Sequence, residues 1–345
     1  MKATINDVAK HAGVSIKTVS RVINNEPAVR KTTFDKVQVS VKALNYRPNN
    51  SARSLAGSKS YTVAFVYDNP NAHYVIEMQN GILAGCHDSH FELLIHPCSH
   101  KDDDLESEFN NLIDHSRVAG VILTPPFSEM PSVSTMLDRL GLANVKIISG
   151  RKPKKNNLSS ILINDHHAAY TLTEHLINLG HKDIGFLCGG MEHKSTVERL
   201  EGYHSALQDN GIEHRKRYVI NGEYSFDSGV QGATKLLSRN RRPTAIFASN
   251  DEIAAGALFA ARLEGIQIPK ELSIVGFEDS PYSRQTRPQL TTAHQPNQII
   301  AKQAANLLIA KIQGRSNEYI KEKELLKGFS PLLVVRGSSN TVFKL

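Results

Sequence analysis

The chain has 345 residues, 40% of them hydrophobic, and a formal net charge of +7 at pH 7. This length exceeds what one hydrophobic core usually organises, so two or three domains are expected. Residues 1–60 carry 11 Lys and Arg against 3 Asp and Glu, net +8, whereas the rest carries 30 against 31, net −1. Such a basic segment indicates a polyanionic partner, and no strongly apolar amphipathic face accompanies it as a membrane surface would require.

Cysteine usage and the lengths of the apolar runs narrow the cellular location. Only three cysteines occur, Cys86, Cys98 and Cys188, and none forms a CxxC pair. This usage argues for a reducing compartment and against a disulfide framework. The N-terminus is polar and shows no secretion signal, and no apolar run approaches membrane-spanning length. We therefore expect a cytoplasmic protein without a membrane partner.

Residues 4–25 have the pattern of two short helices joined by a tight turn. Thr4 is a candidate N-cap, apolar residues follow it at helical spacing, and Gly13 is expected to end the first helix. Ser15 is a good N-cap for the second helix, whose buried face would contain Val19 and Val22, with Ile23 beside them. The pattern predicts a helix-turn-helix.

A third amphipathic stretch at residues 34–44 offers the two helices a surface to bury against. In a DNA-binding helix-turn-helix, the N-terminal end of the second helix meets base edges in the major groove. We expect Lys17 and Arg21 to read bases directly, Ile16 to contact a thymine methyl and Ser20 to contact a base or phosphate. The candidate DNA-binding residues of this unit are Thr4, Ser15, Ile16, Lys17, Thr18, Ser20, Arg21 and Asn24.

The run TINDVAKHAGVSIKTVSRVIN at residues 4–24, with YRPN at 46–49 and ARSLAG at 52–57, resembles the DNA-binding region of the LacI/GalR family of bacterial transcription regulators. The resemblance implies a DNA-binding domain over residues 1–46 and a hinge helix over 47–60, although composition alone would also fit a flexible linker. In the family this segment folds on DNA and pairs with its copy in a second subunit. We therefore expect Arg53 to contact DNA and Leu55 to wedge into the minor groove.

From residue 61 the sequence alternates short β-rich runs with helical stretches. Strands are expected at residues 62–67, 91–96, 120–124, 145–149, 160–163, 184–188, 218–221, 245–248 and 273–277. Helices are expected between most of them, for example at 75–87, 105–115, 166–179, 197–210, 228–237 and 253–263. This alternation predicts βαβ units and parallel sheets covered on both faces. The strands are too many for one compact sheet, so we expect two.

Several segments of this second part resemble the sugar-binding module that the LacI/GalR family shares with periplasmic solute-binding proteins. They are LGHKDIGF at 179–186, RLEGY at 199–203, ND at 250–251, SIVGF at 273–277 and LTT at 290–292. The resemblance implies an α/β two-lobed, periplasmic-binding-protein-like core with parallel sheets over residues 61–345. Lobe 1 would comprise residues 61–161 and 291–320, lobe 2 would comprise residues 162–290 and 321–345, and a ligand would lie between them.

Ligands of parallel sheets bind beyond the carboxyl ends of the strands. Planar groups that bond two adjacent hydroxyls suit a polyol, and an aromatic face can stack on a sugar ring. Polar candidates directly after expected strands are Asp68, Thr124, Asn250, Asp251 and Glu278, and aromatic candidates are Tyr74 and Tyr224. The family resemblance further implies that Arg199 clamps ligand hydroxyls or a carboxylate, that Tyr224 forms an aromatic wall, and that Ser195 and Tyr74 contribute.

Glu278 departs from the family pattern, because most members carry Asp after the Gly-Phe pair. The extra methylene moves the carboxylate by about 1.5 Å. Either the ligand is smaller at this point or the neighbouring Asp279 takes part. The departure leaves the identity of the ligand open.

Enzymatic signatures are missing from the sequence: it contains no GxSxG, GxxxxGK[ST] or HExxH motif. We therefore expect no catalytic residues and no cofactor. One cluster could suggest a metal site, but its spacing matches no closed zinc pattern. Its members are Cys86, His87, His90, His96, Cys98 and His100.

The combined expectation is a ligand-responsive transcription regulator, a repressor that binds a near-palindromic double-stranded DNA operator as a homodimer. A small sugar or glycoside in the interlobe cleft would control it by linkage. The alternative within the family is a repressor that needs its ligand as a corepressor. A free solute-binding protein would require export, and an enzyme would require a nucleophile or a metal set, neither of which the sequence shows.

Overall fold

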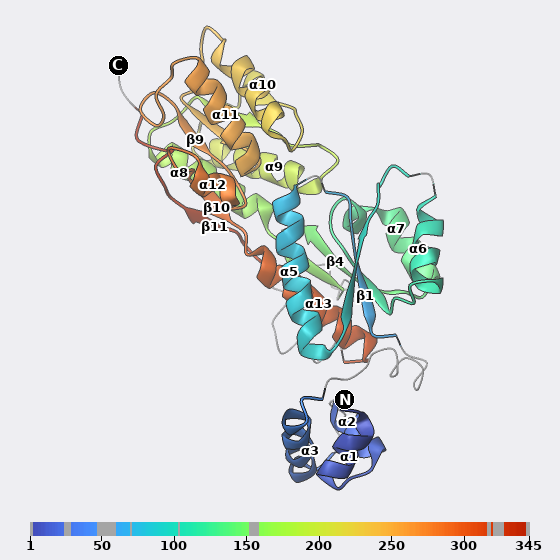
Figure 1. Cartoon of the computed structure of the whole chain (residues 1–345). Coiled ribbons are helices and arrows are strands. Elements are labelled where there is room, and N and C mark those ends of the chain that lie inside the picture. The colour runs from blue at the N-terminus through green and yellow to red at the C-terminus, as the bar shows by residue number, and fades with distance from the viewer. Residues whose placement is uncertain are drawn as a thin grey trace. The chain divides into compact units, whose positions relative to one another are not determined.

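The computed structural model describes residues 3–23, 29–46, 60–69, 71–102, 104–151, 159–315, 319 and 328–342. The chain divides into two compact units, Met1–Tyr61 and Thr62–Leu345, and Figure 1 labels many of their helices and strands. Each unit has a hydrophobic core of its own. Within the described parts of the chain, no helix is both long enough and apolar enough to span a membrane.

The first unit is a cluster of three helices, α1 (Ile5–Ala12), α2 (Ile16–Ile23) and α3 (Lys31–Ala43). Small residues let α1 approach both other helices, which it contacts. The predicted buried face of the second helix is confirmed at Val19 and Val22, and Ile23 packs against the core with partial exposure. The buried residues of this core are Val8, Ala9, Ala12, Val19, Val22 and Val37.

Local hydrogen bonds explain where the first two helices begin. The Thr4 hydroxyl accepts the N–H of Asp7 at 3.4 Å, and the Asp7 carboxylate accepts the N–H of Thr4 at 2.9 Å, which completes a capping box. Gly13 ends α1 with φ +61, a left-handed conformation that glycine adopts without strain. The Ser15 hydroxyl accepts the N–H of Thr18 at 3.2 Å and so caps α2.

Lobe 1 of the second unit is built on a five-stranded parallel sheet with the order β2-β1-β3-β4-β5. The strands are β1 (Thr62–Tyr67), β2 (Glu92–Pro97), β3 (Gly120–Leu123), β4 (Ala143–Ser149) and β5 (Ser160–Ile163). The accompanying helices are α5 (Ala72–Ser89), α6 (Leu105–Asp114), η1 (Phe127–Glu129), α7 (Pro131–Arg139) and α13 (Asn297–Ile312). A Cβ at Gly81 of α5 would lie 2.3 Å from the Gln298 carbonyl oxygen, so this glycine permits the close packing of α5 on α13.

Lobe 2 is built on a four-stranded parallel sheet with the order β7-β6-β8-β9. The strands are β6 (Ile184–Leu187), β7 (Val219–Ile220), β8 (Ala245–Ala248) and β9 (Ser273–Val275). The helices are α8 (Asp165–Asn178), α9 (Lys194–Asp209), η2 (Lys216–Tyr218), α10 (Phe226–Leu237), α11 (Asp251–Leu263) and α12 (Pro281–Gln285). Buried apolar residues cover both faces of this sheet, as a parallel sheet requires.

The predicted fold class, a helix-turn-helix region before a two-lobed α/β core with parallel sheets, is confirmed. Two features were not anticipated. The expected strand at 218–221 is reduced to Val219–Ile220 because Lys216–Tyr218 forms a 3-10 turn. In addition, β10 (Thr292–His294) and β11 (Leu332–Val334) form an antiparallel pair. Because Thr292 bonds to Asp251 of lobe 2 and α13 packs on α5 of lobe 1, the chain passes between the lobes after β10.

Candidate functional site

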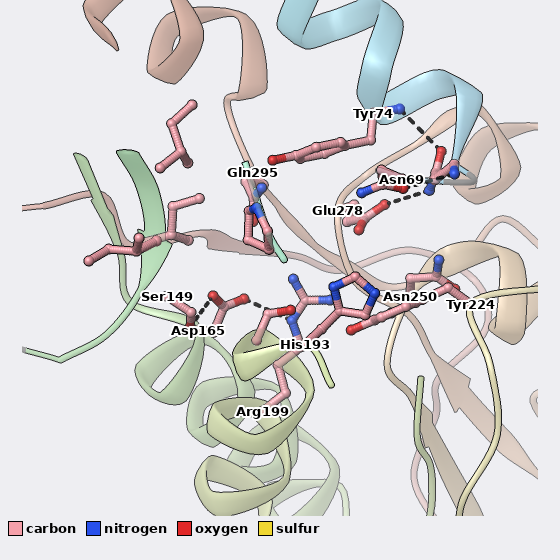
Figure 2. Close-up of a pocket in the computed structure, with 16 residues that line it drawn as sticks. Asn69, Tyr74, Ser149, Asp165, His193, Arg199, Tyr224, Asn250, Glu278 and Gln295 are labelled. Carbon is pink, nitrogen blue, oxygen red and sulfur yellow. Dashed lines mark hydrogen bonds and ion pairs between the residues drawn. The ribbon is translucent and has the colours of Figure 1, made fainter. Parts of the chain in front are cut away.

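A pocket of about 570 Å³, part of it open to solvent, lies at the carboxyl ends of strands from both lobes. In lobe 1, the lining comes from residues that follow β1 and β3 and from the ends of β4 and β5. In lobe 2, it comes from the first turns of α8 and α9 and from the segments after β7, β8 and β9. Figure 2 shows these side chains converging on one space. The lining residues are Asn69, Asn71, Tyr74, Pro125, Ile147, Ile148, Ser149, Ile163, Asp165, His193, Ser195, Arg199, Tyr224, Asn250, Glu278 and Gln295.

A buried ion pair forms one wall of the pocket. The Arg199 Nε donates to Asp165 Oδ1 at 2.8 Å, and both side chains are at most 5% exposed. The Ser149 hydroxyl donates to the other Asp165 oxygen at 2.6 Å. Arg199 Nη1 donates to the Ser249 carbonyl oxygen at 2.6 Å, and the guanidinium lies 3.7 Å from the ring centre of Phe277. Burial alone would lower the pKa of Arg199, but Asp165 beside it holds that pKa above its usual value.

Two polar groups of the lining are buried and have no hydrogen-bond partner among the described residues, the Nδ2 of Asn250 and the Oε1 of Gln295. The other end of each side chain is already engaged. Asn250 Oδ1 accepts the N–H of Ile253 at 2.9 Å and caps α11, and Gln295 Nε2 donates to Asn297 at 2.7 Å. Since buried polar groups normally find partners, the pocket holds one donor and one acceptor that a ligand could satisfy.

Glu278 brings a carboxylate to the opposite wall from the ion pair. Its Oε2 accepts the Nδ2 of Asn71 at 3.2 Å, a bond between the two lobes. Burial raises the pKa of Glu278 to about 7, although the charge of Arg199 lowers it. Its backbone has φ +99 and that of Asp279 has φ +58. Non-glycine residues rarely adopt this region without support from their surroundings.

Asp279 does not line the pocket. One of its oxygens accepts the Ser283 hydroxyl at 2.8 Å and Arg336 Nη2 at 2.6 Å, and the other lies 3.2 Å from His294 Nδ1. These bonds hold the strained turn after β9. Of the two acidic residues after the Gly-Phe pair, Glu278 therefore lines the pocket and Asp279 does not.

Six of the nine residues expected to bind the ligand line the pocket: Tyr74, Ser195, Arg199, Tyr224, Asn250 and Glu278. The other three do not. Asp68 accepts both the backbone N–H and the ring nitrogen of His100, at 2.8 and 2.6 Å. Thr124 is fully buried and does not line the pocket. Asp251 accepts the Thr292 hydroxyl at 2.6 Å and the Ser280 N–H at 2.7 Å, so it supports the turn that carries Glu278.

The sequence search missed several lining residues, most notably Asp165 and Gln295. Asp165 stands two residues after the strand at 160–163, so the rule applied to the other strands would have found it. Gln295 follows β10, which was not anticipated as a strand. Asn69 and Asn71 lie one and three residues beyond Asp68, and a wider window after β1 would have included them.

In the first unit, three of the candidate DNA-binding residues, Ser15, Ile16 and Lys17, lie at the start of α2. Ile16 is 49% exposed, which is unusual for a large apolar side chain in so small a unit, and Lys17 is also exposed. Thr4 and Ser15 additionally act as helix caps. Thr18, Ser20 and Arg21 lie on the same helix. Asn24, Arg53 and Leu55 lie outside the described residues.

The histidine and cysteine cluster is dispersed into separate contacts. His96 Nε2 lies 3.2 Å from Glu108, and His100 pairs with Asp68. Cys86 is buried and Cys98 is half-buried, both as free thiols. In the parts of the chain that the structure describes, no group of three or more His, Cys, Asp or Glu side chains is arranged to hold a metal ion.

Two family profiles match the chain. Residues 4–49 match the bacterial regulatory proteins of the lacI family, and residues 173–339 match the periplasmic binding protein-like domain. The first match covers the helix-turn-helix, and the second covers most of lobe 2 together with α13 and β11. Both profiles therefore correspond to the elements that the structure contains.

Known proteins resemble the chain over nearly its whole length. It is 35% identical over 341 residues to the HTH-type transcriptional regulator GalR of Escherichia coli (strain K12), covering 98% of this chain and 96% of that protein. It is 33% identical over 310 residues to the Catabolite control protein A of Priestia megaterium, covering 89% and 92%.

Solved structures agree with these relatives. The transcriptional regulator CelR–cellobiose complex superimposes with a TM-score of 0.71 at 27% identity, covering 98% of this chain and all of that one. The Lac repressor dimer bound to operator and the anti-inducer ONPF superimposes with a TM-score of 0.72 at 25% identity, covering 99% of this chain and all of that one. The chain therefore belongs to the lacI family of bacterial regulatory proteins and is a ligand-responsive transcription regulator.

Proposed function

We propose that this protein is a homodimeric repressor whose affinity for a near-palindromic operator is controlled by a neutral sugar or glycoside bound between the lobes. The observation that carries the ligand assignment is the pocket itself: a self-neutralised Arg199–Asp165 pair faces the unpartnered polar atoms of Asn250 and Gln295. The relatives named as transcription regulators, and no catalytic motif, support a non-enzymatic role. Cytoplasm is the compartment in which such a regulator meets its operator.

The charge of the pocket favours a neutral ligand over an anion. Arg199 is the one fixed cation among the described lining residues, Asp165 neutralises its charge, and the Ser249 carbonyl and the Phe277 ring also contact its guanidinium. Glu278 adds a carboxylate that a phosphate or carboxylate ligand would meet with repulsion. Hydroxyl groups suit the site because each can donate to Glu278 or Gln295 and accept from Asn250.

Aromatic rings provide the apolar contacts that a sugar ring needs. Tyr74 from α5 and Tyr224 from the segment before α10 both line the pocket. The Tyr224 hydroxyl bonds Thr196 at 2.7 Å, and a Cβ at Gly189 would lie 2.4 Å from the Tyr224 ring, so the ring is held firmly in place. We propose that the Tyr224 ring stacks on the sugar ring and that Ser195 and Arg199 contact the edge of the ligand.

DNA reading is proposed for the exposed side of α2. Ile16 and Lys17 stand at its N-terminal end, where base edges are met in this docking mode. The net +8 of residues 1–60 supplies the attraction to phosphates. Arg53 and Leu55 remain proposed as the minor-groove contacts of the hinge.

A second copy of the chain is proposed to cover exposed apolar side chains on two helices of the core. Ile76 and Leu83 on α5 are 52% and 50% exposed, and Phe259 and Leu263 on α11 are 44% and 70% exposed. Large side chains of this kind mark an interface when they gather in one patch. The Lac repressor structure, which is a dimer, supports a second copy as the partner.

The experiment begins with selecting near-palindromic duplexes that bind the full-length protein from a random library. Binding is then followed by fluorescence anisotropy with neutral mono- and disaccharides, cellobiose among them, and with matched sugar phosphates. We expect a neutral sugar, and no sugar phosphate, to shift operator affinity. A decrease identifies an inducer, and an increase identifies a corepressor. If no duplex is selected, or only anionic ligands act, the proposal is wrong.

Two variants that each remove one positive charge distinguish the contribution of α2 to DNA binding from that of overall charge. Lys17→Ala is expected to weaken the selected duplex by at least tenfold and to reduce the salt dependence of binding. Lys182→Ala removes the same charge from an exposed position in lobe 2 and should leave operator affinity unchanged. Equal effects of the two substitutions would mean that overall charge, and not α2, governs binding.

A further inference from the structure

The N-terminus of α9 receives its cap from the other lobe. The helix begins at Lys194, and its N-cap residue, His193, makes no side-chain cap hydrogen bond within the described chain. The first N–H groups of a helix have no partner inside the helix and carry a positive potential. α9 carries Ser195 and Arg199 in its first two turns, so the position of this helix start decides where two pocket residues stand.

Glu129 of lobe 1 supplies the missing acceptor. Its Oε2 accepts the backbone N–H of Lys194 at 3.1 Å, and its Oε1 accepts the backbone N–H of Ser149 at 3.1 Å. Glu129 ends η1, which the fully buried Phe127 anchors in the core of lobe 1. One carboxylate therefore joins the end of β4 in lobe 1 to the start of α9 in lobe 2.

Glu129 stands behind the pocket and does not line it. Both backbone groups that it binds belong to or adjoin pocket residues, because Ser149 lines the pocket and Lys194 precedes Ser195. Helix α9 also packs directly against β4, so the end of this strand lies close to the helix. The carboxylate thus bridges the two walls without lining the pocket.

Arg151 adds a second tie between the same elements. This residue lies two positions beyond β4, and its Nε donates to Glu198 of α9 at 3.0 Å, while its Nη2 pairs with Glu201 one turn further. The Arg151 side chain is 46% exposed, so water screens these ion pairs and they contribute little individually. Glu129 is half-buried, so its two bonds are better sheltered; this burial raises the pKa of its carboxyl group, and both N–H donors oppose that rise.

We propose that Glu129 is a positioning residue that clamps the start of α9 to lobe 1 and so fixes the position of the two walls of the effector pocket relative to each other. The inference rests on the effector-binding function proposed above. Losing the clamp leaves two N–H groups without their acceptor and allows the lobes to populate other arrangements. Apparent ligand affinity falls with the population of the binding-competent arrangement, here by about tenfold.

The test compares Glu129→Gln, Glu129→Asp and Glu106→Gln in the full-length protein. A Gln side chain offers one acceptor oxygen and places an NH2 group against the second N–H donor. Asp keeps the charge on a shorter stem and is the partial rescue. Glu106→Gln is the matched control, because Glu106 pairs with Arg139 within lobe 1 and touches neither α9 nor β4.

The first readout is amide hydrogen exchange measured by mass spectrometry, which needs no ligand. In Glu129→Gln we expect exchange about tenfold faster at whichever of the Ser149 and Lys194 amides faces the NH2 group, with α10 unchanged. Glu129→Asp should be intermediate, and Glu106→Gln should match the wild type. Wild-type exchange at both amides in Glu129→Gln would overturn the clamp, and so would uniformly faster exchange throughout the core, which indicates general destabilisation.

The second readout is the affinity, measured by calorimetry, for the sugar that changes operator binding in the anisotropy experiment proposed above. We expect about tenfold weaker binding to Glu129→Gln than to the wild type or Glu106→Gln. Unchanged sugar affinity with faster exchange would overturn the link between clamp and pocket. If no sugar acts on the wild type, the proposed function fails, whereas the exchange measurement still decides whether Glu129 ties the lobes together.

Discussion

Replacing Arg199 by Met should destabilise the core strongly while keeping a side chain of similar length. The guanidinium is 5% exposed and Asp165 is 2% exposed. Without Arg199, the Asp165 carboxylate keeps the Ser149 hydroxyl but loses its counter-charge, and the Ser249 carbonyl loses a donor at 2.6 Å. Removing one partner of a buried pair leaves an uncompensated charge, which costs about 3–5 kcal/mol.

The assay is urea unfolding of the full-length protein followed by circular dichroism, because the chain contains no tryptophan. We expect Arg199→Met to lower the free energy of unfolding of the core by about 3–5 kcal/mol with an unchanged m-value. Asp165→Asn should also destabilise, because it removes the counter-charge of the buried guanidinium and leaves it with neutral partners such as the Ser249 carbonyl and the Phe277 ring.

The double variant Arg199→Met/Asp165→Asn completes the cycle. The free energy of unfolding lost in the double variant should be smaller, by about 2 kcal/mol, than the sum of the losses in the two single variants. The reason is that the second substitution removes the charge that the first left unpaired. Additivity within about 0.5 kcal/mol would refute the argument that the two residues stabilise the core as a pair. A small loss of stability in Arg199→Met alone would refute the claim that the buried Asp165 carboxylate needs Arg199 as its counter-charge.

Three further predictions concern other parts of the molecule. Because the pKa of Glu278 is raised to about 7, a sugar that donates hydroxyls to the ionised carboxylate should bind more tightly as the pH rises from 6 to 8. Calorimetry should show this trend lost in Glu278→Gln, and an opposite trend in the wild type contradicts the assignment. Thr4→Ala removes half of the capping box and should lower the opening free energy of α1 by about 1 kcal/mol, seen as roughly fivefold faster amide exchange in that helix and not in α3. Leu263→Asp should weaken self-association at least tenfold in sedimentation experiments, whereas Val39→Asp, 65% exposed on α3, should not; equal effects would remove α11 from the interface.

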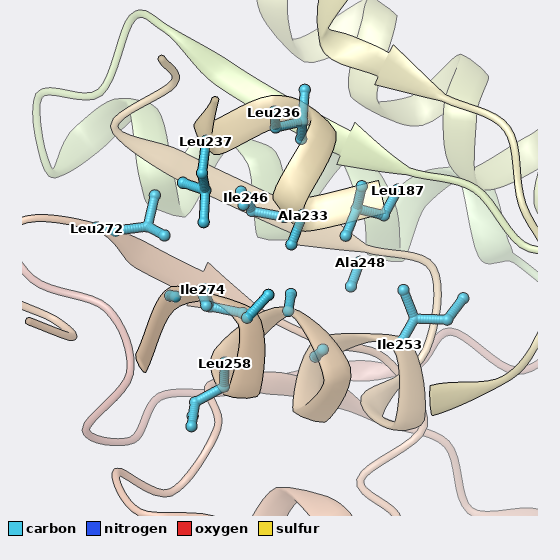
Figure 3. Close-up of a cluster of buried hydrophobic side chains, with 14 of the residues drawn as sticks. Leu187, Ala233, Leu236, Leu237, Ile246, Ala248, Ile253, Leu258, Leu272 and Ile274 are labelled. Atoms are coloured by element: carbon cyan, nitrogen blue, oxygen red, sulfur yellow. The ribbon is translucent and has the colours of Figure 1, made fainter. Parts of the chain in front are cut away.

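Sequence periodicity was sufficient to predict most of the helices and strands, because their formation depends on local physics. The caps Thr4 and Ser15 and the left-handed Gly13 act within a few residues, and the observed helix ends follow them. The buried strands of lobe 2 are continuous apolar runs, and Figure 3 shows Leu187, Ile246 and Ala248 packed with apolar side chains of α10 and α11. A run of this kind predicts a strand covered on both faces whatever its neighbours are.

The family resemblance predicted that Arg199, Tyr224 and Asn250 line the pocket. It did not predict the hydrogen-bond partners of these residues. That Arg199 is already paired with Asp165 depends on α8 and α9 lying side by side, which joins residues 34 positions apart. The exclusion of Asp68 has the same origin, since His100 reaches it from the segment after β2.

Tertiary structure alone decided the charge balance of the pocket and the link between its walls. A sequence counts Arg199 as a cation available to a ligand, whereas the fold neutralises it before any ligand arrives. A sequence likewise shows Glu129 only as an acid after a Pro-Pro pair, whereas the fold places its carboxylate on the first N–H of a helix in the opposite lobe. Hydrogen bonds and burial between distant segments set these properties, and local patterns carry no record of them.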